Sequence, residues 1–343
     1  MRILILADAS VSHPYKWAKI LEDLGNDVRI LTFEKPLNHD LVESFKLPLG
    51  RFKYIFGIPK IAGYVREFKP HILFPHFLPN YGFVSYFFKG FKILALWGSD
   101  IMAWPYKSPL HKRLAENVLK KFNFIVCDAL IVKDILVKDF GILAEKIYVI
   151  PFGVEREIRE KPLKDLPTDV LTFVSTRRIE KLFNHFEILR FIKKLSERFK
   201  VKILYLNDGS LREEVIRFAR DLKIDFEYLG KVPYEEYVEV LQNSHFCISI
   251  PSRDATSVSL LECMALGSVP LVSDIPANRE WVDNNGILTI PNADEMFKGF
   301  ISRFSWDWWK EARMRSKEIV IKRCNWEENV KRFWYEILKG FSV

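Results

Sequence analysis

The sequence predicts an α/β protein built from two tandem Rossmann-like domains that face across a cleft. Short apolar runs of strand length alternate with stretches of helical spacing through both halves of the chain. A polar segment that contains Pro162 and Pro167 separates the halves, as a linker would. The 343 residues, of which 49% are hydrophobic and 28% charged, are enough for two domains with separate cores.

The first half reads as strand and helix in alternation. The segment 13–24 has apolar residues at helical spacing and ends before Gly25, so it predicts a helix. A second helix is predicted over 110–122. The apolar runs predict parallel strands at 2–7, 28–33, 72–75, 92–97 and 129–132.

Alternation restarts after the polar segment 155–169. The predicted helices are 187–199, 211–222, 234–242 and 258–266, and the tail has helical spacing over 326–338. The predicted strands are 171–175, 202–206, 226–229, 246–250 and 269–273.

Charge and composition limit the partners. The net charge is +8, and residues 1–160 hold 23 basic and 17 acidic residues. The first half therefore favours an anionic partner, such as a membrane surface, a lipid phosphate or an acidic glycan. An ordinary soluble surface remains the alternative. The basic residues form no dense cluster, so we expect no nucleic-acid partner.

The expected location is the cytoplasm, with peripheral association at the inner face of the membrane as an open alternative. Four cysteines lie far apart without a C-x-x-C pair, which fits a reducing compartment and argues against a zinc site. The sequence offers no stretch of about 18 uncharged apolar residues for a span. Its first residues lack the form of a signal peptide.

The stretch 251–267 is the most informative about function. Asp254 and Glu262 stand eight positions apart, with a predicted strand before them and a helix that Gly267 ends. Asp254 should therefore lie in the loop after the strand, at the ligand-binding edge of the sheet. The N–H groups near Ser257–Ser259, at the helix start, favour an anion. A phosphate flanked by carboxylates that bind hydroxyl groups suits a sugar nucleotide.

An ordered set of motifs resembles the retaining glycosyltransferases of family 4, which have the two-Rossmann GT-B architecture. The pair Asp254 and Glu262 matches the family signature of two acids separated by seven residues. The other matching segments are His13–Ala18 with Gly25–Val28, Trp97–Asp100, Cys127–Ile131, Glu145–Val154, Asp208–Ser210, Pro276–Trp281 and Asn285–Gly286. The resemblance covers nearly the whole chain.

The resemblance implies a domain division into 1–160 on the acceptor side, 161–320 for the nucleotide sugar, and a C-terminal helix in 321–343 that crosses back to the first domain. It implies transfer of a hexose from a nucleotide-diphosphate sugar to a hydroxyl of a glycan or lipid-linked acceptor, with retention of configuration. Because no D-x-D-type pair lies in the proposed cleft, we expect no metal and no cofactor besides the donor substrate.

The resemblance also implies roles for individual residues. Glu262 would accept hydrogen bonds from ribose hydroxyls, and Asp254 would contact the transferred sugar. Arg177 would bind the diphosphate. The family lysine falls on Leu182, so Lys181 or Arg178 would replace it. The complete prediction is Asp254, Arg177, Lys181 and Asp100 as catalytic residues, and Glu262, Arg178, Gly209, Ser257, Val258 and Ser259 as donor-binding residues.

Three departures from the family pattern leave an alternative open. Asp254 stands where glutamate is usual, Ala255 and Ser257 replace glycines, and Trp97 replaces the loop histidine. The alternative is a non-catalytic sugar-nucleotide or glycan-binding protein on the same fold. A dinucleotide-dependent oxidoreductase is disfavoured because the loop 7–12 lacks G-x-G-x-x-G. A sugar phosphorylase ranks low because no lysine stands as an obvious cofactor anchor.

Overall fold

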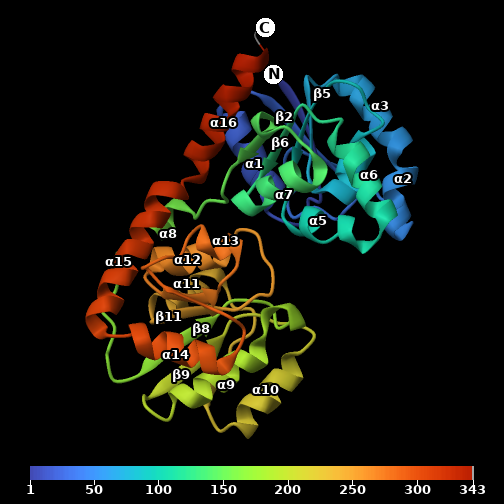
Figure 1. Ribbon diagram of the computed structural model, residues 1–343. Helices are drawn as coiled ribbons and strands as arrows, with labels where there is room; N and C mark the ends of the chain where they lie inside the picture. Colours follow the sequence, from blue (N-terminus) through green and yellow to red (C-terminus); the bar gives the residue numbers. More distant parts are fainter. Residues whose placement is uncertain (342–343) are drawn as a thin grey trace. The chain divides into compact units, whose positions relative to one another are not determined.

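The computed structural model describes residues 1–341 as two compact α/β units (Figure 1). Unit 1 comprises residues 1–151 and 327–341, and unit 2 comprises residues 152–326. The chain passes between the units at 151–152 and 326–327, whereas the sequence analysis places the boundaries at 160 and 320. Each unit has its own parallel sheet, so the predicted two-domain α/β fold class is confirmed.

Unit 1 contains a seven-stranded parallel sheet of order β3-β2-β1-β4-β5-β6-β7. Each strand carries a short apolar run, and the central strands are buried on both faces, as parallel sheets require. The strands are β1 (Arg2–Leu6), β2 (Asp27–Thr32), β3 (Val42–Ser44), β4 (Ile72–Pro75), β5 (Phe91–Ala95), β6 (Phe124–Cys127) and β7 (Ile147–Val149).

Helices cover both faces of this sheet. Trp17 of α1 contacts Phe74 of β4 and Phe333 of α16, whereas the adjacent Leu73 belongs to the cluster beneath α3. Successive strand residues point to opposite faces, so α1 and α16 lie on one face and α3 on the other (Figure 1). The main helices are α1 (His13–Asp23), α2 (Lys53–Phe56), α3 (Ile58–Phe68), α4 (Phe83–Ser85), α5 (Ser99–Met102), α6 (Pro109–Leu119), α7 (Leu130–Phe140) and α16 (Trp326–Phe341).

One predicted strand of unit 1 is wrong. Residues 130–132 of this run begin helix α7, and the strand of this region is β6, which ends two residues before the run. Apolar runs of four residues fit a buried strand and a buried helix start equally well. Here Phe124–Cys127 takes the sheet position between β5 and β7.

Unit 2 contains a six-stranded parallel sheet of order β10-β9-β8-β11-β12-β13. Phe173 and Phe246 pack into the core on one face, and the adjacent Val174 and Cys247 into the core on the other. The strands are β8 (Leu171–Ser175), β9 (Val201–Tyr205), β10 (Asp225–Tyr228), β11 (Phe246–Ser249), β12 (Val269–Ser273) and β13 (Ile287–Thr289).

The helices of unit 2 include one inside the predicted linker. Arg156–Glu160 forms α8, whose Ile158 is buried against the unit core, so 155–169 is not wholly a linker. Trp309 and Ala312 of α15 belong to the core on the other face of the sheet, with Phe173 and Phe246. The remaining helices are α9 (His185–Leu195), α10 (Arg212–Asp221), α11 (Tyr234–Gln242), α12 (Val258–Leu266), α13 (Pro276–Arg279), α14 (Ala293–Arg303) and α15 (Trp306–Arg323).

Two further observations concern the chain as a whole. None of the helices within residues 1–341 has the length and apolar character needed to cross a bilayer. Cys127, Cys247, Cys263 and Cys324 are all buried as free thiols.

Candidate functional site

Three loops of unit 2 are joined at the carboxyl ends of β9, β8 and β11, which are neighbours in the sheet. Asn184 donates from Nδ2 to the carbonyl oxygen of Ile250 at 2.8 Å, which ties the segment after β8 to the end of β11. The backbone N–H of Ile179 donates to the carbonyl oxygen of Asp208 at 3.1 Å, which ties the same segment to the loop after β9. This edge is where open parallel sheets bind ligands.

Arg177 and Asp254 form the centre of this edge. Nη2 of Arg177 donates to Oδ2 of Asp254 at 2.8 Å, and Nη1 donates to Oγ of Ser257. The guanidinium also lies 4.4 Å above the ring centre of Phe183. Burial raises the pKa of Asp254, and the Arg177 cation opposes that rise. The sequence-predicted Arg177, Asp254 and Ser257 are therefore brought together.

Helix α12 begins at this cluster. Ser257 is its N-cap and accepts at Oγ from the backbone N–H of Leu260 at 3.4 Å. The next two N–H groups, of Val258 and Ser259, have no acceptor within the helix because they precede its first full turn. With the helix dipole they form a favourable position for an anionic group beside the Arg177 guanidinium.

Glu262 lies on the accessible side of the same helix. Six of the nine residues of α12 are buried, and the other three are Val258, Ser259 and Glu262. Positions 258, 259 and 262 share one helix face because they are three and four residues apart. The predicted donor-binding residues of α12 therefore form one stripe that runs from the helix start.

Two tyrosines of α11 hold the Glu262 carboxyl group. Tyr237 donates from its hydroxyl to Oε2 at 2.8 Å, and Tyr234 donates to Oε1 at 3.3 Å. Burial and the nearby Glu262 raise the pKa of Tyr237 well above its ordinary value, so Tyr237 remains a donor. Neither tyrosine is among the residues predicted from the sequence, although their spacing puts them on one face of α11.

The remaining predicted residues of unit 2 surround this centre less directly. Lys181 is exposed, and its ammonium group has no ion-pair partner among residues 1–341. The exposed Arg178 pairs with Glu180 at 3.4 Å. A Cβ atom on Gly209 would lie 2.3 Å from the carbonyl oxygen of Ile179, so glycine permits the close approach of two loops. These observations give Gly209 a structural role in shaping the site.

Asp100 lies in unit 1 and is fully buried. Oδ1 accepts from the backbone N–H of Trp97 at 3.0 Å, and Oδ2 accepts from that of Leu78 at 3.1 Å. Burial raises the pKa of Asp100 to about 6, and these backbone N–H groups oppose the rise. Its contacts are those of a residue that ties the loop after β5 to the segment after β4.

An aromatic cluster occupies the carboxyl edge of the unit 1 sheet. The Trp97 ring meets the His13 ring at 4.7 Å and the His76 ring at 5.5 Å, edge to face in both pairs. Burial lowers the pKa of His13 to about 4 and that of His76 to about 3, so both rings are neutral near pH 7. Both ring nitrogens of His76 are buried and have no hydrogen-bond partner within residues 1–341. The sequence analysis did not single out His76.

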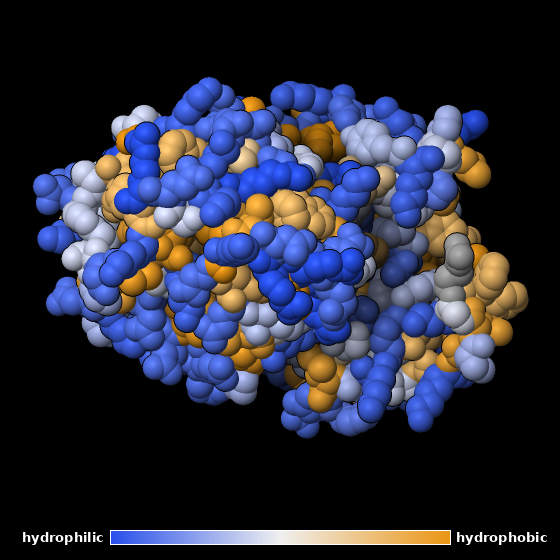
Figure 2. All heavy atoms as spheres, turned by 90° about the horizontal axis from the view of Figure 1, so that it is seen from below, coloured by the Kyte–Doolittle hydropathy of each residue, from blue (hydrophilic) through white to orange (hydrophobic). Residues whose placement is uncertain are grey.

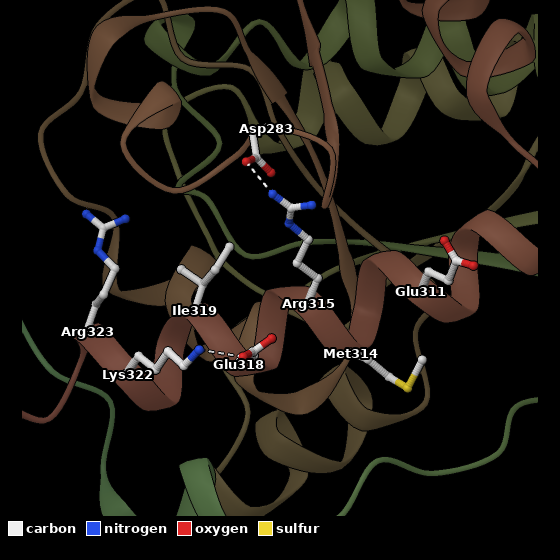
Figure 3. A pocket seen from close by; sticks show the side chains of 8 residues that line it. All are labelled: Asp283, Glu311, Met314, Arg315, Glu318, Ile319, Lys322 and Arg323. Atoms are coloured by element: carbon white, nitrogen blue, oxygen red, sulfur yellow. Dashed lines mark hydrogen bonds and ion pairs between the residues drawn. The ribbon is translucent and has the colours of Figure 1, made fainter.

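A groove of about 690 Å³ runs along α15 on unit 2. None of the residues that line it is a predicted site residue. Figure 3 shows the side chains that line it, with ion pairs from Arg315 to Asp283 at 2.8 Å and from Lys322 to Glu318 at 2.5 Å. These two ion pairs join four of its charged side chains, and we assign the groove no function. Within residues 1–341, no group of three or more histidines, cysteines or acids could hold a metal ion.

Two models of known families match the chain. Residues 154–323 match the model of the glycosyl transferases group 1, and residues 2–129 match the glycosyl transferase 4-like model. The two matches cover most of both parallel-sheet units. Sequence comparison with curated proteins found no match.

Solved structures with the same fold cover nearly the whole chain. A glycosyltransferase from Rickettsia africae ESF-5 has 18% identity and a TM-score of 0.81, with 98% of each chain covered. Sucrose-phosphate synthase from Thermosynechococcus elongatus has 13% identity and a TM-score of 0.84, with 100% of this chain and 99% of that one covered. HepE from Anabaena, in complex with UDP and glucose, has 14% identity and a TM-score of 0.78, with 99% and 100% covered. These structures show the GT-B fold, and the two family matches identify the chain as a member of the group 1 glycosyltransferases.

Proposed function

We propose that this protein transfers a hexose from a nucleotide-diphosphate sugar to a hydroxyl group of a glycan or lipid-linked acceptor, with retention of the anomeric configuration. The observation that carries the proposal is the arrangement in unit 2 of Arg177, Asp254 and the α12 stripe that ends at Glu262. A cation and a helix start suit the diphosphate, and carboxylates on either side suit hydroxyl groups.

In this proposal each group has one task. Glu262 accepts from the ribose hydroxyls while Tyr237 and Tyr234 hold its orientation. Arg177 and the N–H groups of Val258 and Ser259 stabilise the negative charge on the departing diphosphate. Asp254 accepts from hydroxyls of the sugar. The exposed Lys181 supplies a further positive charge near the leaving group.

The reaction needs one bond exchange at the anomeric carbon. The acceptor oxygen forms a bond to that carbon on the face from which the phosphate oxygen leaves, and the acceptor proton moves to the leaving phosphate oxygen. The family resemblance supports this same-face course. The protein contributes orientation and charge stabilisation, which together account for large rate accelerations in other enzymes. We propose that no metal ion takes part.

The first donor to test is UDP-glucose, because HepE of the same fold was crystallised with it. Thermal shifts over a panel of nucleotide sugars should show selective stabilisation by one compound through mass action. Sugar release or transfer in the presence of EDTA should then be detectable with that compound. Donor binding without hydrolysis or transfer to any acceptor would favour the non-catalytic alternative, and absence of binding by every nucleotide sugar would contradict the proposal.

A further inference from the structure

One region of unit 1 concentrates the positive charge of the protein. Between Ser44 and Ser99 the chain has eight lysines and arginines and a single acid, Glu67. The net charge of this region is therefore close to that of the whole chain, which is +8. Lys92 is buried, and Lys53 pairs with Glu34, which lies outside this region. The exposed cations include Lys46, Lys60, Arg66, Lys69 and Lys89, and they attract anionic partners over roughly a Debye length, about 8–10 Å at physiological salt.

The segment Leu49–Phe56 within this region presents apolar side chains to solvent. A 3₁₀ turn, Gly50–Phe52, leads directly into α2. The exposed fractions are 43% for Leu49, 58% for Phe52, 51% for Ile55 and 63% for Phe56. Figure 2 shows that hydrophilic residues cover much of the face drawn there, with hydrophobic residues between them. Single exposed apolar residues are common, but four in eight positions form a defined surface.

The same segment turns the side chains of Lys53 and Tyr54 inward. Nζ of Lys53 lies 2.7 Å from Oε1 of Glu34, and the Tyr54 hydroxyl donates to the same oxygen at 2.6 Å. Tyr81 donates to the other carboxylate oxygen at 2.5 Å. These contacts lower the pKa of Glu34 against the effect of its burial, so it is ionised near pH 7. The ion pair fixes α2 on the sheet.

This orientation is the reverse of an ordinary surface helix. A lysine that could reach water is held on the inner side, while two phenylalanines stand in solvent. Burying an ion pair carries a desolvation cost, and exposing phenyl rings forgoes hydrophobic stabilisation. The arrangement is favourable when an apolar phase covers the outer side.

The charges around the apolar side chains indicate which phase this is. Lys46 and Lys60 are exposed next to the segment, and no acid lies between Phe45 and Arg66. Apolar side chains with lysines beside them, whose long stems let the ammonium groups reach lipid headgroups, suit the surface of an anionic bilayer. A second copy of this chain would bring the same positive charge to the contact, which disfavours self-association.

We propose that the surface formed by Leu49, Phe52, Ile55 and Phe56, with Lys46 and Lys60 beside it, docks unit 1 on an anionic lipid bilayer. The apolar side chains enter the headgroup boundary, and the lysines pair with lipid phosphates. We call it the docking surface. It goes beyond the proposed transfer reaction and does not depend on it, because the donor site lies in unit 2.

The test is flotation of the full chain with vesicles of phosphatidylcholine, with and without phosphatidylglycerol. The wild type should float with the anionic vesicles, and added salt should weaken its binding. Phe52→Ser with Phe56→Ser should lower the partition coefficient about tenfold or more, and Lys46→Glu with Lys60→Glu should do the same. None of these four residues belongs to the cluster of Glu34 with Lys53, Tyr54 and Tyr81. Melting curves check that each variant is folded.

Matched controls come from exposed residues elsewhere on unit 1. Leu110→Ser with Leu143→Ser removes side chains that are 74% and 57% exposed, and Lys19→Glu with Lys107→Glu makes the same charge change. These variants should bind like the wild type. The proposal would be overturned if the wild type bound neutral and anionic vesicles equally, or if it bound neither. It would also be overturned if the control variants lost as much binding as the docking-surface variants. So would a dimer that the Phe52 and Phe56 changes convert to monomer. Nucleotide-sugar binding without vesicles should be unchanged, which separates this test from that of the donor site.

Discussion

Arg177 and Asp254 form an ion pair at 2.8 Å although 77 positions separate them in the chain. They meet because β8 and β11 are adjacent parallel strands, so the loops that follow them leave the same edge of the sheet. Their side chains are 15% and 20% exposed, so the pair is mostly screened from water yet open to a ligand. A donor that binds here meets a guanidinium already oriented by a carboxylate, a serine hydroxyl and the Phe183 ring.

Replacement of Arg177 by lysine should separate charge from geometry. Lysine keeps one positive charge but cannot donate to Asp254 and Ser257 at once with a planar fork. We expect kcat to fall by a factor on the order of 10 to 10² for Arg177→Lys and by about 10² or more for Arg177→Ala. Arg190→Lys, at an exposed ion pair of unit 2, is the control. Turnover of Arg177→Ala at the wild-type rate would exclude a role in stabilising the leaving group.

Tyr237 should act through Glu262 as a positioning residue. Tyr237→Phe removes the 2.8 Å hydrogen bond and keeps the ring, so we expect about tenfold weaker donor binding with kcat nearly unchanged. Tyr234→Phe removes the longer contact of 3.3 Å and should have the smaller effect. Titration calorimetry with the nucleotide diphosphate measures the dissociation constant of each variant. A purely structural Tyr237 would lower thermal stability without changing the dissociation constant of the folded protein.

Gly209 should tolerate no side chain. In Gly209→Ala the new methyl group would meet the backbone of Ile179 at 2.3 Å, which forces apart the loops after β8 and β9. We expect a loss of about 1–3 kcal/mol in unfolding free energy and weaker donor binding. Gly299→Ala in α14 is the control, because its nearest contact is an ordinary 3.6 Å to Ile287. Equal denaturation midpoints for the two variants would contradict the close approach.

Acid should destabilise unit 1 through His76 and His13. The pKa in the folded protein is about 3 for His76 and about 4 for His13, below the ordinary 6.5. Between the folded pKa of each histidine and pH 6.5, the unfolded chain therefore binds more protons than the folded protein. Each contribution is complete above about pH 6.5 and is lost as pH falls, by about 1.4 kcal/mol per pH unit. Asp100 has the opposite sign, because its raised pKa of about 6 stabilises the fold below that pH.

Comparison of the wild type with His76→Leu isolates the contribution of His76 to the pH dependence of stability. His76→Leu should flatten the fall in unfolding free energy between about pH 6 and pH 4 by about 1.4 kcal/mol per pH unit. His39→Gln, at an exposed position, should keep the wild-type slope. Urea denaturation at several pH values measures both. Parallel slopes for His76→Leu and wild type would show that His76 titrates normally.

The parts of the structure that the sequence predicted are those set by local pattern and by sheet topology. The strand before Asp254 and the helix that carries Glu262 follow from two apolar runs and a terminating glycine. The meeting of Arg177 with Asp254 follows from the parallel-sheet rule. The roles assigned to Arg177, Asp254 and Glu262 remain predictions, because the geometry shows proximity rather than catalysis.

The parts that the sequence did not predict depend on packing between elements. The Tyr237 contact with Glu262 depends on how α11 lies against α12, which spacing within either helix does not fix. The four-residue run at 129–132 was too short to distinguish a strand from a helix start. The inward Lys53 and outward Phe56 reverse the usual pattern of burial, so periodicity alone points the wrong way there.

The most direct test of the central claim is donor affinity measured by titration calorimetry for wild type, Arg177→Ala, Glu262→Gln and the control Glu236→Gln. The claim is that Arg177, Asp254 and Glu262 bind one nucleotide sugar in unit 2. We predict that a single nucleotide sugar binds the wild type and the control alike, and that each site variant weakens this binding about tenfold or more. Wild-type affinity in both site variants would contradict the claim.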